Sequence, residues 1–293
     1  MALIVVAYVL VDKYIKYQFM QNAVYAGLLA AIACGIIGTY VVVKRMVFIS
    51  GGISHASFGG IGLGYYLAQY ISWMTPVYGA LIFTLFSALG MGAFVKRTRL
   101  SEDTVIGIMW AVGMAIGIIF IGLTPGYTPD LTGYLFGSIL TVSQANLIMM
   151  LILNAIIIAT VVMLYKEFLA ISFDQEFGTA LGLPTQRLYL ILLCLIALTV
   201  VLLIRVVGII LIIALLTIPA ATARQHTHNL KKMMLLSITF GIIAVLGGLW
   251  LSYEMNLASG ATIILLSAVI FAASTLFTRL RHRKRNSLES PAD

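Results

Sequence analysis

The sequence predicts an all-α polytopic membrane protein with about nine, alternatively eight, transmembrane helices and one short helix on the cytoplasmic side. Hydrophobic residues make up 61% of the 293 residues and charged residues only 10%, whereas a soluble domain carries about 25% charged residues. The charged residues also fall in short clusters between long uncharged runs, which is typical of helices that cross a bilayer. The composition therefore excludes an ordinary soluble domain.

The net charge of +8 does not indicate nucleic-acid binding, because the basic residues form neither an arm nor a continuous face. We expect the chain to contact membrane lipid and not to bind nucleic acid. Cys34 and Cys194 lie inside apolar segments without the spacing of a metal site or a disulfide framework, so we interpret both as packing residues.

Nine spans result when the uncharged runs are divided at glycine, proline and polar clusters, since a span needs about 20 mostly apolar residues. They are approximately 23–43, 53–71, 77–95, 104–124, 144–165, 187–204, 206–223, 233–252 and 257–277. Trp73 and Pro76 mark the break between the second and third spans, as residues typical of an interface and of a first helical turn. Little more than Arg205 separates the sixth from the seventh, so one long helix followed by a short broken one gives the alternative count of eight.

The basic residues predict the orientation of these spans. When the spans are threaded alternately, one side collects 15 of the 18 basic residues, and only Lys13, Lys16 and Arg205 lie on the other. By the positive-inside rule the richer side is cytoplasmic. We therefore expect residues 1–22 to be an interfacial segment that begins outside, residues 23–278 to form the membrane domain, and residues 279–293 to be a basic cytoplasmic tail.

His55 is the candidate pathway residue, because it is the only histidine in the run from Met46 to Val95, which contains no Asp, Glu, Lys or Arg. An ionisable side chain at membrane depth is costly unless it faces a cavity, a bundle interior or a partner. The glycines on both sides of His55 leave room for close helix contacts or for a passing ion, and Ser50 and Ser54 add neutral oxygens. The alternative is a buried histidine that hydrogen-bonds a carbonyl group in a helix contact.

Two acids lie in predicted outer loops. Asp130 begins an apolar stretch of the loop 125–143, which we interpret as a re-entrant or interfacial helix with Asp130 as its N-cap. Direct contact of Asp130 with a metal ion is the alternative. Glu254 is a loop acid or part of a docking rim, so both residues are candidates for an outer vestibule.

The longest predicted cytoplasmic loop, residues 166–187, carries a helical pattern of its own. Phe173, Phe177 and Leu181 recur at helical spacing, Glu176 lies on the polar side, and Gly182 with Pro184 supplies a helix stop. This pattern predicts a short amphipathic helix under the membrane, and periodicity alone does not exclude one without a protein partner.

The segments KRMVFISGGISHASFGGIGLG and EFGTALGLPTQRLYLILLCLIALTVVLLIRVVGIILIIALLTIPAATAR resemble the zinc/manganese-type metal-import ABC permeases, and the resemblance covers nearly the whole chain. It implies a homodimer in a prokaryotic plasma (inner) membrane, a cytoplasmic ABC ATPase and an extracytoplasmic metal-binding protein. It also implies that the segment from Phe173 to Pro184, with Gly178 and Gly182, is the coupling helix that docks on the ATPase. The cargo is a divalent transition metal, with zinc expected first and manganese or iron as alternatives.

One position departs from that family, whose members often carry an acid four residues before the histidine, where this chain has Gly51. The missing carboxylate leaves fewer charged ligands, which puts the choice of metal in doubt. His226 and His228 form an H-x-H pair in an inner loop, but the neighbouring cations repel a dication and favour two solvated histidines.

Absent motifs exclude several functions for the chain itself. There is no G-x-x-x-x-G-K-[ST] nucleotide-binding loop and no hydrolase motif, so we expect no enzyme activity, no bound cofactor and ATP hydrolysis on a separate subunit. The alternative function is a self-sufficient secondary transporter or channel for a small cation. Such pathways normally contain several intramembrane acids or bases, whereas His55 stands almost alone.

Overall fold

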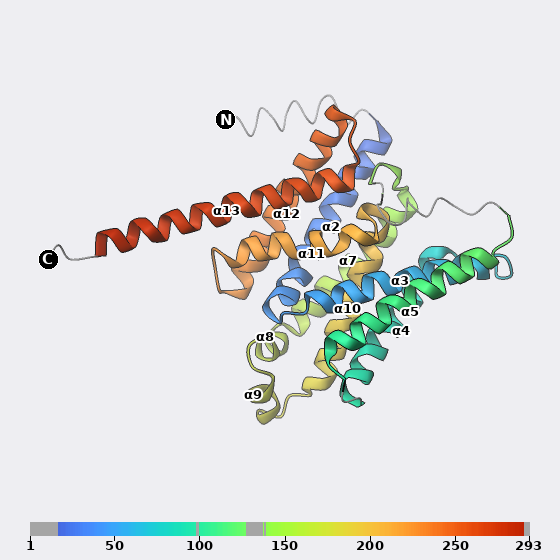
Figure 1. The fold of residues 1–293 in the computed structure, drawn as a ribbon, viewed down its shortest axis with the longest axis horizontal. Helices are drawn as coiled ribbons and strands as arrows, with labels where there is room; N and C mark the ends of the chain where they lie inside the picture. Colours follow the sequence, from blue (N-terminus) through green and yellow to red (C-terminus); the bar gives the residue numbers. More distant parts are fainter. Residues whose placement is uncertain (1–16, 98–99, 127–136, 138, 290–293) are drawn as a thin grey trace.

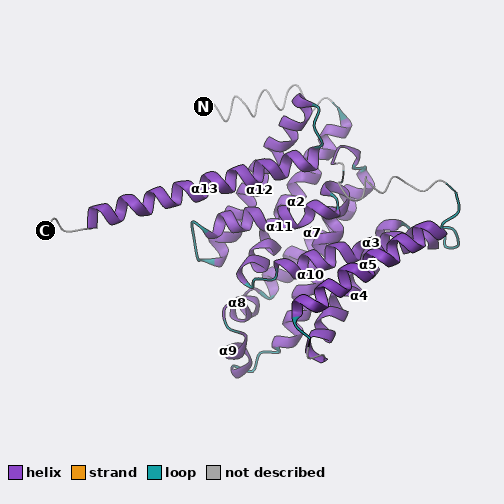
Figure 2. Cartoon of the chain, viewed as in Figure 1, coloured by secondary structure: helices purple, strands orange, loops and turns teal. Residues whose placement is uncertain are grey.

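The computed structural model describes residues 17–97, 100–126, 137 and 139–289, with the side chains of 95–97, 205–207, 210–211 and 282–289 left out. This part of the chain contains helices and loops and no strand (Figure 2). The helices form one bundle, from which the last helix extends (Figure 1). The predicted all-helical fold is therefore confirmed.

The bounds of the elements follow the apolar runs closely. They are α2 (Gln18–Val43), α3 (Val47–Leu67), α4 (Pro76–Arg97), α5 (Glu102–Leu123), η1 (Ile139–Thr141), α7 (Gln144–Met163), α8 (Tyr165–Phe173), α9 (Gln175–Ala180), α10 (Thr185–Val207), α11 (Ile209–Arg224), α12 (Leu230–Met255) and α13 (Ser259–Glu289).

The nine predicted spans are not confirmed. Within the described ranges, seven helices are long and apolar enough to cross a membrane: α2, α4, α5, α7, α10, α12 and α13. The helix α3 has 21 residues but is rich in glycine and serine, which lowers its hydropathy below that of the seven. The helix α11 has only 16 residues, fewer than the roughly 20 that a span needs.

Several predicted boundaries are wrong by three residues or more. The helix α2 begins at Gln18, five residues before the predicted start, and α3 begins at Val47, so that Ser50, Gly51 and Gly52 lie inside a helix. Burial against neighbouring helices outweighs the weak helix propensity of glycine there. The helix α10 passes Arg205 and ends at Gly208, whose φ of 80° is the left-handed conformation that glycine adopts without strain.

The helix α3 packs closely between α4 and α5 through two glycine faces (Figure 1). A Cβ atom on Gly60 would meet the carbonyl oxygen of Gly79 in α4, and one on Gly62 would meet the carbonyl oxygen of Gly117 in α5. Backbones this close require residues without side chains, as in small-xxx-small contacts between membrane helices. The order of the contacts shows that α3 runs antiparallel to α4 and parallel to α5.

The predicted cytoplasmic clusters meet at one end of the bundle. Arg224 donates to the carbonyl oxygen of Val42 over 2.9 Å, and Lys44 donates to that of Ile171 over 2.7 Å. Lys231 lies 5.0 Å from the centre of the Tyr165 ring. The C-terminal ends of α2, α7 and α11 and the N-terminal end of α12 thus lie together. The side of the membrane that they face stays a prediction.

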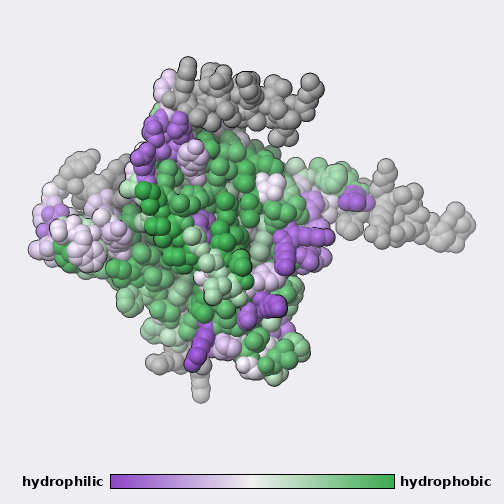
Figure 3. All heavy atoms as spheres, turned by 180° about the vertical axis from the view of Figure 1, so that it is seen from behind, coloured by the Kyte–Doolittle hydropathy of each residue, from purple (hydrophilic) through white to green (hydrophobic). Residues whose placement is uncertain are grey.

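Apolar side chains cover much of the surface (Figure 3). Phe86, Val162 and Leu265 are each at least 68% exposed, which suits a lipid or protein neighbour. The helix α13 continues beyond the last predicted span to Glu289, so the first part of the predicted basic tail is helical.

We expect Gly117→Ala to destabilise the bundle. The new Cβ would lie 2.5 Å from the carbonyl oxygen of Phe58, and overpacking of this kind costs about 1–3 kcal/mol. The matched control is Gly122→Ala in the same helix, where a Cβ would meet nothing within 4 Å. The thermal midpoint of the purified protein in detergent should fall for the first variant and stay level or rise for the second. Equal midpoints would show that the α3–α5 contact is looser than described.

Candidate functional site

His55 lies eight residues into α3 and is 7% exposed. Its ring stacks on Trp110 of α5, with ring centroids 3.8 Å apart and an angle of 11° between the planes. The Nδ1 atom is buried and has no hydrogen-bond partner among the described residues. The parallel packing of α3 and α5 accounts for the stack, because Trp110 lies eight residues into its own helix.

The unpartnered nitrogen argues against the simpler interpretation of His55. A packing histidine is expected to hydrogen-bond a carbonyl group, and Nδ1 makes no such bond. Leaving a buried polar group unsatisfied costs about 1–3 kcal/mol, so each case calls for an explanation. Four other buried side-chain atoms of the described residues are unpartnered as well, in Tyr40, Asn154, Tyr189 and Ser237, and among these five residues only histidine is a common ligand of transition metals.

The predicted serine partners do not contact the imidazole through hydrogen bonds in the described structure. The Ser54 hydroxyl donates to the carbonyl oxygen of Ser50 over 2.7 Å, and the Ser50 hydroxyl donates to that of Val47 over 2.7 Å. Both side chains are fully buried. Their hydroxyl protons therefore serve the helix, and only the oxygen lone pairs are left to face an ion.

Gly51 faces a different neighbour from His55. A Cβ atom at Gly51 would lie 3.0 Å from Cδ1 of Ile213 in α11. An acid at this position would therefore point at the α3–α11 contact, and its absence leaves that contact apolar.

The other candidate ligands are not brought to His55 in the described residues. No group of three or more His, Cys, Asp or Glu residues in these ranges could hold a metal ion. Asp130 and the predicted re-entrant helix around it lie outside the described residues. Glu254 is exposed in the last turn of α12, at the opposite end of that helix from Lys231. Within the described ranges, His55 therefore stands without a second histidine, cysteine or acid pair that would complete a three-ligand metal site.

His226 and His228 do not form a site together in the described structure. The Nε2 atom of His226 lies 2.8 Å from the Ser274 hydroxyl, and the neighbouring Gln225 donates to Thr275 over 2.7 Å. This polar cluster joins the loop before α12 to α13, which is a structural role.

The amphipathic helix predicted from Phe173 to Pro184 is shorter in the structure: α9 covers Gln175–Ala180, and Phe173 is the last residue of α8. Asp174 separates them and accepts from the backbone N–H of Phe177 over 2.9 Å, as an N-cap does. Gly182 then turns the chain at a φ of 80°, and Pro184 directly precedes α10. The capping carboxylate competes with helix continuation, which explains the break.

Apolar side chains of α8, of α9 and of the residue after α9 are exposed. Phe173, Phe177 and Leu181 are each about 60% exposed, and Glu176 is exposed beside them. Gly178 is buried, and a Cβ atom at this position would lie 3.3 Å from Cγ2 of Thr185. Exposed aromatic rings on a surface helix favour an interaction with another molecule.

The α8 helix also contacts the corner from which α3 starts. Lys44, the residue after α2, donates to the carbonyl oxygen of Ile171 in α8, and Tyr40 packs against Phe168 with ring centroids 5.5 Å apart. Burial lowers the pKa of Lys44, an effect that the nearby Glu102 opposes. A movement of α8 would therefore act on the end of α2 and the turn that leads into α3.

Sequence reasoning missed Trp110. The available signal was its position, since tryptophan in membrane helices is enriched at the interfaces and Trp110 lies in mid-helix. The buried Asn154 was also missed; it donates to the carbonyl oxygen of Leu29 over 3.2 Å and joins α7 to α2.

Comparison with known proteins identifies the family. Residues 16–278 match the model of the ABC 3 transport family. The chain belongs to this family. The recognition of a metal-import ABC permease from its sequence segments is thereby confirmed.

Two relatives and one solved structure show how far this similarity extends. Over 265 residues, the ABC 3 chain is 50% identical to the uncharacterized membrane protein slr2045 of Synechocystis sp., covering 90% of this chain and 92% of the relative. It is 37% identical to the manganese transport system membrane protein MntC of Listeria monocytogenes, covering 89% and 91%. It superposes on a chain of PsaBC from Streptococcus pneumoniae in complex with Fab with a TM-score of 0.81 and 33% identity, covering 90% and 93%.

We expect His55→Phe to keep or raise the stability of the protein, and His55→Ala to lower it. Phenylalanine retains the stack on Trp110 and removes the unsatisfied nitrogen, whereas alanine loses an aromatic contact worth about 0.5–1.5 kcal/mol beyond its buried area. Thermal midpoints of the two purified variants test this. A large loss of stability in His55→Phe would indicate a hydrogen bond that the described structure lacks.

Proposed function

We propose that the chain is the membrane permease subunit of an ATP-driven ABC importer and that it carries a divalent transition metal ion past His55. The observation that carries this proposal is the buried imidazole with an unpartnered nitrogen on the glycine-rich helix α3. Neutral imidazole is the commonest nitrogen ligand for such ions. Membership of the ABC 3 family favours this function over the alternative of a self-sufficient secondary transporter or channel.

Manganese is the first candidate cargo, and zinc and iron are the competitors. The relative from Listeria monocytogenes is named for manganese transport, whereas the resemblance described above implies zinc first. Imidazole and neutral oxygens accept all three ions, and a thiolate that would select zinc is absent from α3. The order of the three candidate ions therefore rests on the name of that relative, and a comparison of their uptake tests it.

A weak site suits transport, because a full tetrahedral set of ligands would hold zinc too tightly to release it. His55 from each chain of a homodimer, assisted by Ser50, Ser54 or backbone oxygens, would bind a metal ion and release it. We therefore propose a homodimer, with the ion as cargo and no resident cofactor.

The proposed partners are a cytoplasmic ABC ATPase and an extracytoplasmic metal-binding protein. We place the basic end of the bundle in the cytoplasm of a prokaryotic cell, with the N-terminus outside and the C-terminus inside the plasma membrane. The ATPase would dock on α8 and α9, where Phe173 and Phe177 are exposed. The contact of Lys44 with Ile171 then offers a direct route from the docking site to α3. Glu254, with Asp130, remains the candidate for an outer vestibule.

Uptake of metal by proteoliposomes that contain the permease and its ATPase should depend on His55. We expect His55→Phe and His55→Ala to lower the rate about tenfold or more, since even residues that only support a ligand change metal affinity 10–100-fold. His228→Phe, which removes an exposed loop histidine, is the matched control and should keep the parental rate. Comparing manganese, iron and zinc in the same assay ranks the cargo.

Two outcomes of that assay would contradict the proposal. Parental rates in both His55 variants would make His55 a packing residue. Equal uptake with and without ATP would favour the secondary transporter or channel.

Glu176→Lys should uncouple ATP hydrolysis from uptake. The residue is exposed in the first turn of α9, so the substitution reverses a charge on the proposed docking surface without entering the bundle. Asp103→Lys is the matched control, because it makes the same charge change in the first turn of α5 at the same end of the bundle. Both variants should insert normally into the membrane, and only Glu176→Lys should separate ATP hydrolysis from uptake.

The orientation of this surface can be checked in cells that express the protein. A cysteine in place of Gln175 should react with an impermeant thiol reagent only after the membrane is opened. Normal uptake and normal co-purification of the ATPase with Glu176→Lys would contradict a docking role for α9.

A further inference from the structure

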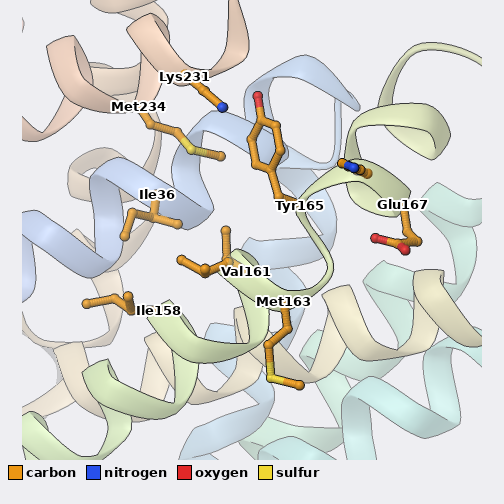
Figure 4. A pocket seen from close by; sticks show the side chains of 10 residues that line it. Ile36, Ile158, Val161, Met163, Tyr165, Glu167, Lys231 and Met234 are labelled. Carbon is orange, nitrogen blue, oxygen red and sulfur yellow. The ribbon is translucent and has the colours of Figure 1, made fainter.

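A crevice of about 700 Å³ lies between α2, α7 and α12 at the basic end of the bundle. Its wall is apolar, with Ile36 from α2, Val161 from α7 and Met234 from α12 (Figure 4). Tyr165, Glu167 and Lys231 lie near its mouth, together with Lys166. The crevice thus combines an apolar groove with a polar, mostly basic rim, and the proposed transport site does not use it.

The groove runs into the apolar layer rather than along the protein surface outside it. Ile36 lies seven residues before the end of α2, which corresponds to about 10 Å along the helix. The residues from Ile158 to Met163 form the last turns of the spanning helix α7. A soluble protein would have to enter the membrane to fill this groove, whereas an acyl chain is already there.

The charges at the rim select the headgroup. The ammonium group of Lys231 lies over the Tyr165 ring, 5.0 Å from its centre, and this cation–π contact holds it at the mouth. Lys166 also lines the crevice and is exposed. Glu167 is the one acid among the residues that line the crevice, so two cations face one carboxylate and an anion is favoured. Basic pockets between membrane helices on the cytoplasmic side suit anionic lipid headgroups.

We propose that this crevice binds one anionic phospholipid of the cytoplasmic leaflet, with an acyl chain against Ile36, Val161 and Met234 and the phosphate at Lys231 and Lys166. The lipid would bridge α12 to the junction of α7 and α8. Because α8 leads into α9 and contacts Lys44, an occupied crevice would fix the position of the segment proposed to couple to the ATPase. The lipid site itself does not depend on the proposed transport function.

Native mass spectrometry of the full-length protein in detergent, titrated with palmitoyl-oleoyl phosphatidylglycerol or phosphatidylcholine, tests this proposal. The parent should bind one phosphatidylglycerol in preference to phosphatidylcholine. K231Q and K166Q should each weaken phosphatidylglycerol binding about fivefold, the effect of one cation near a lipid surface. K232Q removes the neighbouring exposed lysine, which does not line the crevice, and should leave the affinity unchanged.

Two further measurements separate a lipid from other occupants. Val162, which lines the crevice and is 70% exposed, can be changed to Trp without disturbing the core, and Val162→Trp should reduce binding of both lipids by filling the groove. Soluble glycerol 1-phosphate should not displace the lipid. Displacement by glycerol 1-phosphate would indicate a free phosphate site. Binding of lipid to the monomer alone would indicate that a second copy covers the groove in the dimer. Equal lipid affinities of K231Q and K232Q would place the lipid elsewhere. Each of these three outcomes overturns the proposal.

Discussion

The close approach of α3 to α4 and α5 is the constraint on which the rest of the structure depends. Membrane helices gain little from the hydrophobic effect against lipid, so they associate through packing and small residues. In α3, glycines face Gly79 on one side and Gly117 on the other, at distances that exclude a Cβ atom. The helix is consequently buried along most of its length, and any polar side chain that it carries must find a partner inside the protein.

His55 is the place where that rule is broken. The stack on Trp110 compensates for part of the burial of the ring, but Nδ1 stays unsatisfied in the described structure. An orphaned polar group is expected at a site that awaits a ligand, because function commonly accepts a local loss of stability. The same helix starts beside Lys44, whose ammonium group contacts α8. The proposed metal contact at His55 and the proposed docking of the ATPase on α8 and α9 would therefore be linked through Lys44.

The sequence predicted the helical class, the break at Pro76 and a short helix in the loop after α7, because each depends on local composition and spacing. It also singled out His55, since an ionisable group in an uncharged run needs no tertiary information. Trp110 and the contact of Lys44 with Ile171 could not be predicted, because they depend on which helices pack together. The count of nine spans is not confirmed, because glycine and serine lower the hydropathy of α3 and α11 has only 16 residues. Gly208 ends α10 three residues after the expected break.

Pulsed electron paramagnetic resonance of Mn²⁺ bound to the assembled transporter tests the central claim, that the buried imidazole of His55 contacts the cargo. Protein labelled with ¹⁵N-histidine should give a nitrogen coupling to Mn²⁺ that disappears in His55→Phe and remains in His228→Phe. A coupling that persists in His55→Phe, or that is absent from the parent while Mn²⁺ is transported, would contradict the account.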